Sequence, residues 1–375
     1  MAFRKRLQAV HVPHHKNTAG MKAETLPPPK EVLLPMNMHM GTPAVPVVSV
    51  GDYVRVGQKL ARGEGSITCE VHATVSGTVL SLDPMPELFG NDLPVIRIEN
   101  DGKMEADPTL APRTAEDLAA FVEDLHESGI VGLGGAAFPV DWKFDAALRN
   151  NVKTMLINGA ECEPYVTSDN RMMLDHGEDI RRGIELLKKY VKPDNFVFAI
   201  ENNKPHAIAA MKELFADDPT MSIVELPSSY PQGAKQMILY NALGKVVYAG
   251  QRFATLGVII INVSTLAKVA KFMDTRFGED QHAEEPARPD RHAVPLPGRG
   301  RRRAQMRAGP CCERWADDGS RRPLARLSGT QDDRQRAGLL RSGQRYPRAD
   351  AMHPLRPVRV PLPDESQPHR VLGRS

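Results

Sequence analysis

Short apolar runs interrupted by glycine dominate residues 47–105. They lie in the stretches VVSVGDYVRVGQKLARGEG, CEVHATVSGTVLSL and LPVIRIEN, and each run has the length of a single strand. Strands of this length, separated by glycine turns at this spacing, predict a small β barrel or sandwich. We expect the glycines to form its turns rather than to hold a ligand.

The apolar period changes over residues 114–272. The segment TAEDLAAFVEDLHESG places its apolar side chains on one face of a helix, and Thr114 with Asp117 three residues later fits a capping box that opens this helix. Runs rich in β-forming residues, namely TMLIN, NFVFAIEN, MSIVELP and TLGVIIIN, then alternate with helical patterns such as EDIRRGIELLKKYV. Strands that alternate with helices predict an α/β domain with a mainly parallel sheet.

The segment before the barrel, residues 1–46, is rich in Pro, His and Met and predicts an extended arm. His11, His14 and His15 lie close enough in sequence to suggest a metal site. However, no acidic residue or Cys shares their spacing, and Pro13 keeps the backbone extended. The preferred interpretation is a polar arm laid over the next domain.

The distribution of charge divides the chain in two. The net charge is only +3, yet residues 1–275 carry 28 basic and 33 acidic groups, whereas residues 276–375 carry 21 basic and 13 acidic groups. The last hundred residues contain no Lys, no Ile and twelve Pro. Such a composition cannot bury enough apolar surface to offset the entropy of ordering, so it predicts a disordered Arg/Pro-rich tail.

Several classes of protein are disfavoured by the sequence. No run approaches the ~18 consecutive apolar residues of a membrane-spanning helix. The basic start MAFRKRLQAVHVPHH lacks the apolar core of an export signal, so we expect a cytosolic setting. The four cysteines, Cys69, Cys162, Cys311 and Cys312, form no paired framework and predict reduced thiols.

A glycine-rich segment, GIVGLGGAAFPVDWKF, extends from Gly129 to Phe144. Glycines allow the backbone to approach a phosphate closely, and the amide groups of the loop can then hold the anion. Lys143 adds a positive charge within reach. The segment matches neither GxGxxG nor GxxxxGKS, and glycine-rich turns are common beside sheets, so a phosphate site and an ordinary turn with a solvated Lys both remain open.

Polar residues follow the strand TMLIN in the segment INGAECEPYVTSDNRMM, which extends from Ile157 to Met173. Ligands of open α/β sheets bind at the carboxyl ends of strands, so Asn158, Glu161 and Glu163 could bind ribityl or ribose hydroxyls or a ring NH. The alternative is structural, with Asn158 capping a helix and Glu161 stabilising an N-terminal turn. Cys162 has no His nearby in sequence and is expected to be a buried thiol rather than a nucleophile.

The barrel segment resembles the biotinyl and lipoyl carriers. GDYVRVGQ and HATVSGTV are similar to the two halves of their barrel-sandwich fold. A working carrier needs a Lys between the halves, because the prosthetic group is attached through its amine, and the intervening ARGEGSITCEV contains none. The resemblance therefore implies a scaffold without a carrier function.

The segments GLGGAAFPVDWK and NGAECEP together resemble a known flavin-binding signature. It is shared by the 51 kDa subunit of respiratory complex I, NAD-reducing hydrogenases and the C subunits of Rnf (Rsx) electron transport complexes. The barrel, the arm HVPHHKNTAG, and the segments LPMNMHMGTPAVPVVSVGD, IENNKPHAI and YPQGAKQMI favour the Rnf family. The resemblance covers residues 8–272 and implies a barrel-sandwich hybrid domain followed by an α/β flavin-binding domain of the 51 kDa type.

The same resemblance implies the cofactors FMN and NAD(H) and a set of binding residues. The glycine loop would wrap the FMN phosphate and the approach of NADH, with Lys143 on the flavin side. The NxxExEP positions would surround the isoalloxazine and nicotinamide, and looser matches add further pocket residues. The chain departs from the family at Ala137, where Gly is common, and at Val140 and Asp141, where Thr-Gly is common. Asp141 beside a phosphate loop is electrostatically unfavourable. The implied cofactor-binding residues are Gly132, Gly134, Gly135, Ala136, Lys143, Asn158, Glu161, Glu163, Tyr230, Gly233, Lys235, Asn262 and Thr265.

The function implied by the resemblance is that of a peripheral subunit at the cytoplasmic face of the cell membrane. In that family, FMN and [4Fe-4S] centres carry electrons between NAD(H) and ferredoxin within an ion-translocating complex, so the implied partners are the other subunits, NADH and, indirectly, ferredoxin. Iron-sulfur clusters need spaced Cys ligands, which this chain lacks. A non-catalytic fragment that only folds or docks is therefore the alternative.

The tail can be interpreted as another reading frame. With permitted codons, ERWADDG moved forward by one nucleotide can spell SGGPMMG, and MHPLRPVRVPLPDESQPHR can spell CIRCGRCVSRCPMNLSPT, which has the CxxCxxCxxxCP spacing of a [4Fe-4S] ligand run. This predicts a frame shift between Asp274 and Gln281. The alternative, an Arg-rich nucleic-acid arm, is disfavoured because acidic residues and Pro are scattered through the tail and aromatic residues are nearly absent.

Overall fold

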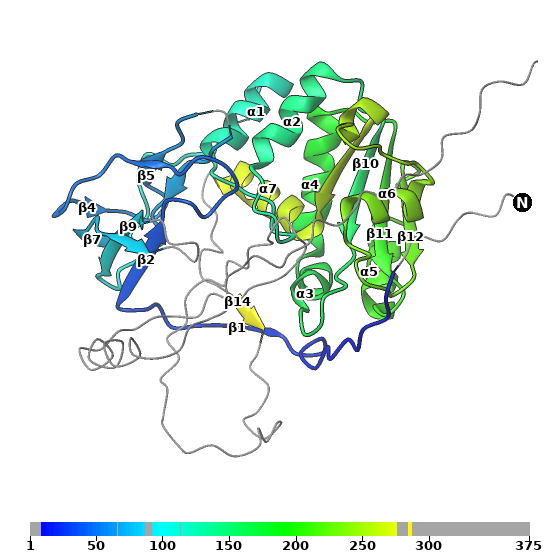
Figure 1. Ribbon diagram of the computed structural model, residues 1–375, viewed down its shortest axis with the longest axis horizontal. Helices are drawn as coiled ribbons and strands as arrows, with labels where there is room; N and C mark the ends of the chain where they lie inside the picture. Colours follow the sequence, from blue (N-terminus) through cyan, green and yellow to red (C-terminus); the bar gives the residue numbers. More distant parts are fainter. Residues whose placement is uncertain (1–8, 66, 87–91, 113, 276–283, 287–375) are drawn as a thin grey trace, which may run out of the picture. The chain divides into compact units, whose positions relative to one another are not determined.

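A computed structural model of the chain describes residues 9–65, 67–86, 92–112, 114–275 and 284–286. These residues form a group of small antiparallel sheets followed by a parallel sheet with helices (Figure 1). The tail and the predicted frame shift lie outside the described residues, apart from β14 (Glu284–Pro286), which pairs antiparallel with β1 (Ala23–Thr25).

The predicted β domain is present as two antiparallel sheets that enclose a common core. In the larger sheet the strands follow the order β2-β9-β7-β4, with β8 paired to β9, and the smaller sheet has the order β3-β5-β6. Gly51 and Gly57 have positive φ angles of 92° and 83°, as turns at these positions require. The strands are β2 (Glu31–Pro35), β3 (Val45–Pro46), β4 (Tyr53–Val54), β5 (Lys59–Arg62), β6 (Val71–His72), β7 (Gly77–Ser81), β8 (Pro84–Pro86) and β9 (Asp92–Asn100).

The β domain begins earlier than the predicted boundary at residue 47. Strand β2 pairs with β9, and Leu34, Met36 and Ala44 are buried in the same core as Val54 and Ile96. The predicted arm therefore contributes its last part to the barrel. The polar and proline-rich composition of this stretch conceals the strands, because only alternate residues of β2 face the core.

Before β2, the arm contacts the α/β domain with residues 10–19 and the barrel with Pro29 and Lys30, whose carbonyl oxygens accept hydrogen bonds from Asn100. The backbone of Val10 pairs with that of Tyr230, and Tyr165 N donates to His14 O at 2.9 Å. In the part of the chain that the structure describes, no group of His, Cys, Asp and Glu could hold a metal ion. The rings of His11 and His14 instead meet edge to face.

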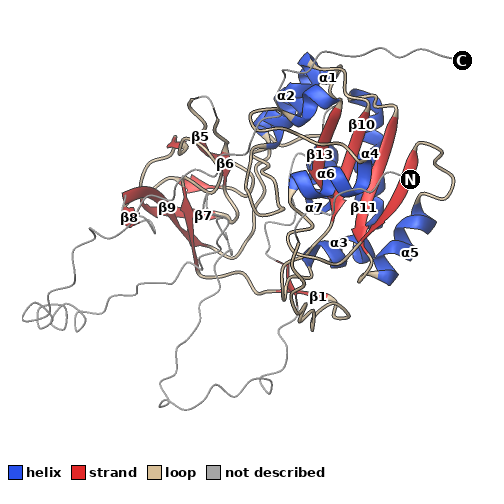
Figure 2. Ribbon diagram, turned by 45° about the vertical axis from the view of Figure 1, so that its right-hand side comes forward, coloured by secondary structure: helices blue, strands red, loops and turns tan. Residues whose placement is uncertain are grey.

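The α/β domain is built on four parallel strands in the order β12-β11-β10-β13, as the alternation of strands and helices predicts. Figure 2 shows helices on both faces of this sheet. Successive side chains of β10 lie on opposite faces of the sheet. Met155 and Ile157 belong to the hydrophobic core on one face, and Leu156 belongs to the core on the other face. The strands are β10 (Thr154–Gly159), β11 (Asn195–Glu201), β12 (Met221–Leu226) and β13 (Val258–Asn262).

Burial on both faces explains why these strands are almost continuously apolar in sequence. Helix α6 packs on one face, and the helices α4, α5 and α7 contribute to the core on the other. The helices are α1 (Leu118–Glu127), α2 (Val140–Arg149), α3 (Ser168–Asp175), α4 (Gly177–Tyr190), α5 (Pro205–Leu214), α6 (Lys235–Leu243) and α7 (Val263–Thr275). A short 3-10 helix, Phe253–Leu256, precedes β13.

Helix α1 starts later than the predicted capping box. Asp117, not Thr114, is the N-cap, and its carboxylate accepts a hydrogen bond from Ala120 N at 2.9 Å. The predicted apolar face is present, since Phe121 and Leu125 are buried. Both residue types are common at N-caps, so the sequence pattern alone did not distinguish them.

None of the helices among the described residues has both the length and the apolar character needed to cross a bilayer. Two of the predicted reduced thiols lie in this part of the chain. Cys69 and Cys162 are both free and buried.

The capping geometry of α1 leads to a stability prediction. Asp117→Ala removes the acceptor for Ala120 N and should lower the free energy of unfolding by about 1 kcal/mol. Thr114→Ala is the matched control and should leave it unchanged, because Thr114 is exposed and outside the helix. Urea unfolding followed by circular dichroism measures both. Equal losses in the two variants would contradict the assigned cap.

Candidate functional site

The ends of β10 and β13 define the place where a ligand can bind. Strand β11, which follows β10 in sequence, pairs with one edge of β10, and β13 pairs with its other edge. The strand order therefore reverses between β10 and β13. Asn158 and Asn262 are register partners at the carboxyl ends of these two strands. In open α/β sheets, such a switch point is where a crevice forms.

A cleft lies at this position. Eight of the thirteen residues predicted from the sequence line it, together with Phe138 and Ile260, which sequence reasoning missed. Phe138 is an apolar residue of the predicted glycine-rich loop, and Ile260 is an apolar residue of a predicted strand. Nothing in the sequence distinguished either of them as a binding residue. The lining residues are Gly132, Gly134, Ala136, Phe138, Lys143, Asn158, Gly233, Lys235, Ile260 and Asn262.

The glycine loop is held at both ends by backbone hydrogen bonds. Gly132 N donates to Phe138 O at 2.8 Å, and Val140 N donates to Ile130 O at 3.0 Å, so the loop closes on itself just before α2. Gly135 has a φ of 104°, a conformation that side chains disfavour. Gly135 does not line the cleft but allows the loop to turn.

Thr265 holds the tip of this loop from α7. Its hydroxyl accepts a hydrogen bond from Leu133 N at 2.9 Å and lies 3.3 Å from Asn262 Oδ1. The side chain is fully buried and does not line the cleft. It joins the glycine loop to the end of β13.

Two lysines line the cleft. Lys143 comes from the first part of α2 and Lys235 from the start of α6, and neither forms an ion pair or hydrogen bond with any described residue. Burial, together with the charge of Lys235, lowers the pKa of Lys143 to about 8. Burial also lowers the pKa of Lys235, whose ammonium lies 5.7 Å from the centroid of the Phe138 ring.

The cleft fits a phosphate group. A Cβ added to Gly132 would lie 3.5 Å from Lys143 Nζ, and one added to Gly134 would lie 3.4 Å from the side chain of Asn262. Side chains at these positions would therefore occupy the space between the loop and the polar groups opposite. The amides of Gly132 and Leu133 are already donated to Phe138 O and Thr265 Oγ1, so the donors that the cleft offers a phosphate are the two ammonium groups, and the bare glycines leave the space for it.

The carboxylate of Asp141 does not repel a phosphate in the cleft, although the position of Asp141 beside the glycine loop suggested that it would. Its carboxylate is buried against α1, where Asp141 Oδ2 lies 2.9 Å from Nδ1 of His126. This hydrogen bond raises the pKa of His126, with burial opposing the shift. Asp141 is thus paired with His126 and does not line the cleft.

Asn158 joins two loops at the floor of the cleft. Its Nδ2 donates to Gly233 O at 3.1 Å, and its Oδ1 accepts from Ala160 N at 3.0 Å. Gly233 N in turn lies 3.5 Å from the buried thiol of Cys162. The predicted residues Asn158 and Gly233 are therefore brought together. Asn158 closes a turn at the end of β10 instead of capping a helix, since Thr167 is at the N-cap position of α3.

Glu161, Glu163 and Tyr230 do not line the cleft. Glu161 is buried, and its Oε1 accepts from Asp169 N at 2.8 Å in the first turn of α3, as the structural alternative predicts. Burial raises the pKa of Glu161, and it raises the pKa of Asp169 to about 7, with the charge of Glu161 as the next cause. Tyr230 contributes its backbone to the pairing with Val10.

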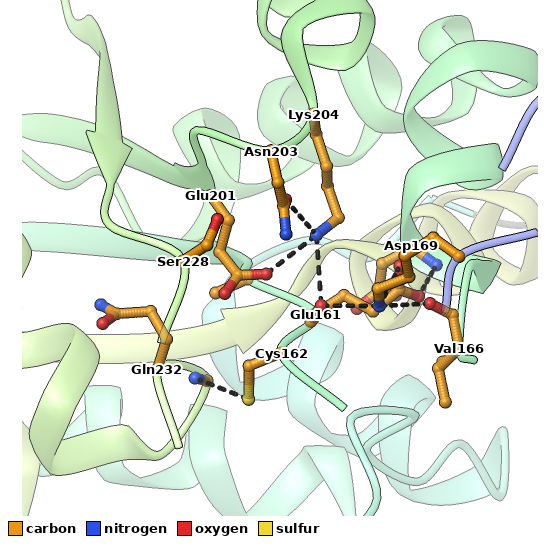
Figure 3. A network of polar contacts seen from close by, with 12 residues as sticks. Glu161, Cys162, Val166, Asp169, Glu201, Asn203, Lys204, Ser228 and Gln232 are labelled. Atoms are coloured by element: carbon orange, nitrogen blue, oxygen red, sulfur yellow. Dashed lines mark hydrogen bonds and ion pairs between the residues drawn. The ribbon is translucent and has the colours of Figure 1, made fainter. Parts of the chain in front are cut away.

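A buried network of charged groups lies around Glu161, as Figure 3 shows. Lys204 Nζ donates to Glu201 Oε2 at 2.9 Å, to the Asn203 side chain at 3.1 Å and to Glu161 O at 3.2 Å. Lys204 and Glu201 are only three residues apart, but Lys204 meets Glu161 from 43 residues away, and the sequence analysis singled out neither this pair nor Asp169. The spacing of residues along the chain carries no signal for such contacts.

Two family models match the chain in succession. The RnfC barrel-sandwich hybrid domain matches residues 5–103, and the Nuo51 FMN-binding domain matches residues 125–271. The C subunit of the Na(+)-translocating ferredoxin:NAD(+) oxidoreductase complex of Acetobacterium woodii is 35% identical over 270 residues, which cover 71% of this chain and 61% of that protein. The chain belongs to the RnfC family.

Other RnfC relatives have similar identities. The C subunit of the proton-translocating ferredoxin:NAD(+) oxidoreductase complex of Clostridium ljungdahlii is 35% identical, over 68% of this chain and 56% of that protein. The C subunit of an ion-translocating oxidoreductase complex of Haemophilus influenzae (strain PittEE) is 34% identical, over 70% of this chain and 41% of that protein. This RnfC chain therefore spans between two fifths and about three fifths of these three relatives.

The RnfC assignment confirms two of the predicted features. The first domain is a barrel-sandwich hybrid, and the α/β domain is an FMN-binding domain of the Nuo51 type. A solved NAD+-reducing [NiFe]-hydrogenase in the H2-reduced state aligns with 43% of this chain and 32% of that chain at 21% identity and a TM-score of 0.36, a likeness too low to support a conclusion.

Two of the three cleft glycines, Gly132 and Gly233, should respond differently to the addition of a methyl group. In Gly233→Ala the new Cβ would lie 2.9 Å from the backbone oxygen of Ala160. We expect this overlap to lower the free energy of unfolding by about 1 to 3 kcal/mol. Gly132→Ala is the control, since its Cβ meets only the end of Lys143 and the loop at ordinary contact distance. Thermal unfolding compares them, and equal stabilities would contradict the described packing.

Proposed function

We propose that this chain binds FMN in the glycine-lined cleft and exchanges electrons between the flavin and NAD(H). The observation that carries this proposal is the convergence of Lys143 and Lys235 on a loop of bare backbone. Two ammonium groups that have no acidic partner among the described residues need an anion, and a flavin phosphate supplies one. Bound FMN would accept a hydride from NADH and pass electrons on one at a time.

Each group of residues would have its own task in this site. Lys143 and Lys235 would bind the phosphate, and Gly132, Gly134 and Ala136 would leave the space in which it lies. Asn158 and Asn262 would fix the floor of the cleft, with Gly135, Gly233, Thr265 and Tyr230 supporting the loops around it. Glu163 would bind the nicotinamide, and Glu161 would support the loop that carries Glu163.

The names of the relatives support a wider role within a membrane complex. We propose that the parent protein is a peripheral subunit at the cytoplasmic face of an ion-translocating complex that exchanges electrons between NAD(H) and ferredoxin. Its partners would be the other subunits, with ferredoxin reached indirectly. Iron-sulfur centres would carry the electrons onward, but their spaced Cys ligands are absent from this sequence, in which Cys311 and Cys312 are adjacent.

A second candidate function follows from this missing ligand set. It is that of a fragment that folds and docks without completing electron transfer, because the match to the FMN-binding domain ends at residue 271 and no cysteine cluster follows it. We propose that a frame shift between Asp274 and Gln281 removed the cluster domain. The nucleotide sequence across codons 270–285 tests this, and an intact single frame would contradict it.

The lysine cleft gives a prediction for the affinity of FMN. Lys143→Met should weaken FMN binding to the full chain by about tenfold at pH 7, because it removes one charge-assisted contact with the phosphate. Lys153→Met, which changes an exposed lysine of the same domain, should leave the affinity unchanged. Flavin fluorescence quenching measures both dissociation constants.

The same affinity should depend on pH in a direction set by Lys143. Its pKa of about 8 in the free protein means that the ammonium loses its proton as the pH rises through that value, so FMN affinity should fall from about pH 7 to about pH 9. Lys143→Met should show a flatter profile, and riboflavin, which lacks the phosphate, should show none. A wild-type profile that rises with pH would contradict the phosphate assignment.

Anaerobic bleaching by NADH distinguishes the two candidate functions. The full chain reconstituted with FMN should lose its absorbance at the flavin maximum on addition of NADH if the hydride step is intact. A chain that binds FMN but is not bleached supports the docking fragment. NADH reduction of free FMN under the same conditions is the control.

A further inference from the structure

An ammonium group from the N-terminal arm lies inside the loop that follows β10. Lys16 Nζ donates to the carbonyl oxygens of Glu161 and Glu163, each at 2.9 Å, and to that of Val166. It also lies 3.7 Å from Glu161 Oε2. Four oxygen atoms of the loop 161–166 therefore surround one charge, in the way that a loop surrounds a bound cation.

We propose that Lys16 is a positioning residue for the flavin cleft. Its ammonium determines the shape of the loop 161–166 and, through Glu161 and Asp169, the position of Asn262. This inference rests on the proposed binding of FMN. It assigns a task to the arm that neither the glycine loop nor the cleft lysines perform.

A continuous series of contacts joins Lys16 to the cleft. Glu161 Oε1 accepts from Asp169 N at 2.8 Å, and Asp169 Oδ2 accepts from Asn262 Nδ2 at 2.7 Å. Asn262 lines the cleft, and its Oδ1 accepts from Thr265 N at 3.1 Å. Glu161, Asp169, Asn262 and Thr265 are all buried, so a shift at one end is not absorbed by solvent.

The arm holds Lys16 in place from both sides. On one side, Tyr165 N donates to His14 O at 2.9 Å, and on the other, the hydroxyl groups of Thr18 and Thr167 lie 2.7 Å apart. Both partners of the arm, Tyr165 and Thr167, flank Val166, whose carbonyl accepts from Lys16. The arm is thus bound to the same loop that its lysine organises.

Both the positive charge and the tetrahedral geometry of the ammonium group are needed at this position. A hydrocarbon side chain would leave the three carbonyls without this donor and would remove the cation beside the buried carboxylate of Glu161. Lys204 also donates to Glu161 O, at 3.2 Å, but its ammonium is held by Glu201 and cannot replace Lys16. An ammonium has three N–H groups in a tetrahedral arrangement, whereas a guanidinium is planar.

Chemical rescue in the full chain tests the inference. Lys16→Ala should weaken FMN binding by about tenfold or more, as displaced site residues do. Added n-propylammonium, which matches the atoms removed, should restore most of the lost affinity. Sodium chloride at equal ionic strength and n-propanol should not. Lys22→Ala, an exposed lysine of the same arm, is the matched control and should bind FMN as the wild type does.

The other possible results of these FMN-binding measurements also decide for or against the role of Lys16. A folded Lys16→Ala variant with wild-type FMN affinity, or a weakened one that n-propylammonium does not restore, would overturn the inference. If Lys16→Ala fails to fold, Lys16→Arg decides: weaker FMN binding with intact circular dichroism supports the inference, and wild-type affinity overturns it. Failure of the unmodified chain to bind FMN would instead overturn the proposed function, and the inference with it.

Discussion

The parallel pairing of β10 with β13 is the constraint on which the site depends. It places Asn158 opposite Asn262 at one edge of the sheet, and every loop of the cleft is attached to one of these two residues. Asn158 binds the loop of Gly233, and Asn262 contacts Thr265, which holds the glycine loop. A slip of β13 by one residue against β10 would turn Asn262 to the other face of the sheet and leave the glycine loop without this anchor.

Around this edge the structure separates charges of opposite sign. No described acidic residue lines the cleft beside its two lysines, and the carboxylates of Asp141 and Glu161 are each paired elsewhere. Asp141 is bound to His126, and Glu161 is turned toward Lys16 and α3. If these carboxylates faced the cleft, they would neutralise its two lysines. Because they are paired elsewhere, the cleft keeps a positive charge that attracts an anion.

The sequence predicted those features that depend on local patterns. Continuous apolar strands buried on both faces, the glycine loop and Asn158 were all recognised because their signals lie within a few residues. For Glu161, the contact with the first turn of α3 was one of two alternatives, and the contact with Lys16 was not predicted, since Lys16 lies 145 residues away. The start of α1 at Asp117 was missed because Thr114 is an equally common N-cap type, and the strand β2 before residue 47 was missed because polar residues and prolines weaken its local pattern.

The separation between Lys16 and its loop also has a consequence for synthesis of the protein. The arm leaves the ribosome well before residues 161–167, so its lysine and its threonine have no partners until the first strand of the parallel sheet and the loop behind it have emerged. Such a distant pairing closes late and slowly during folding. Residues 14–18 of the arm can therefore take their place in the α/β domain only after residues 161–167 have been made.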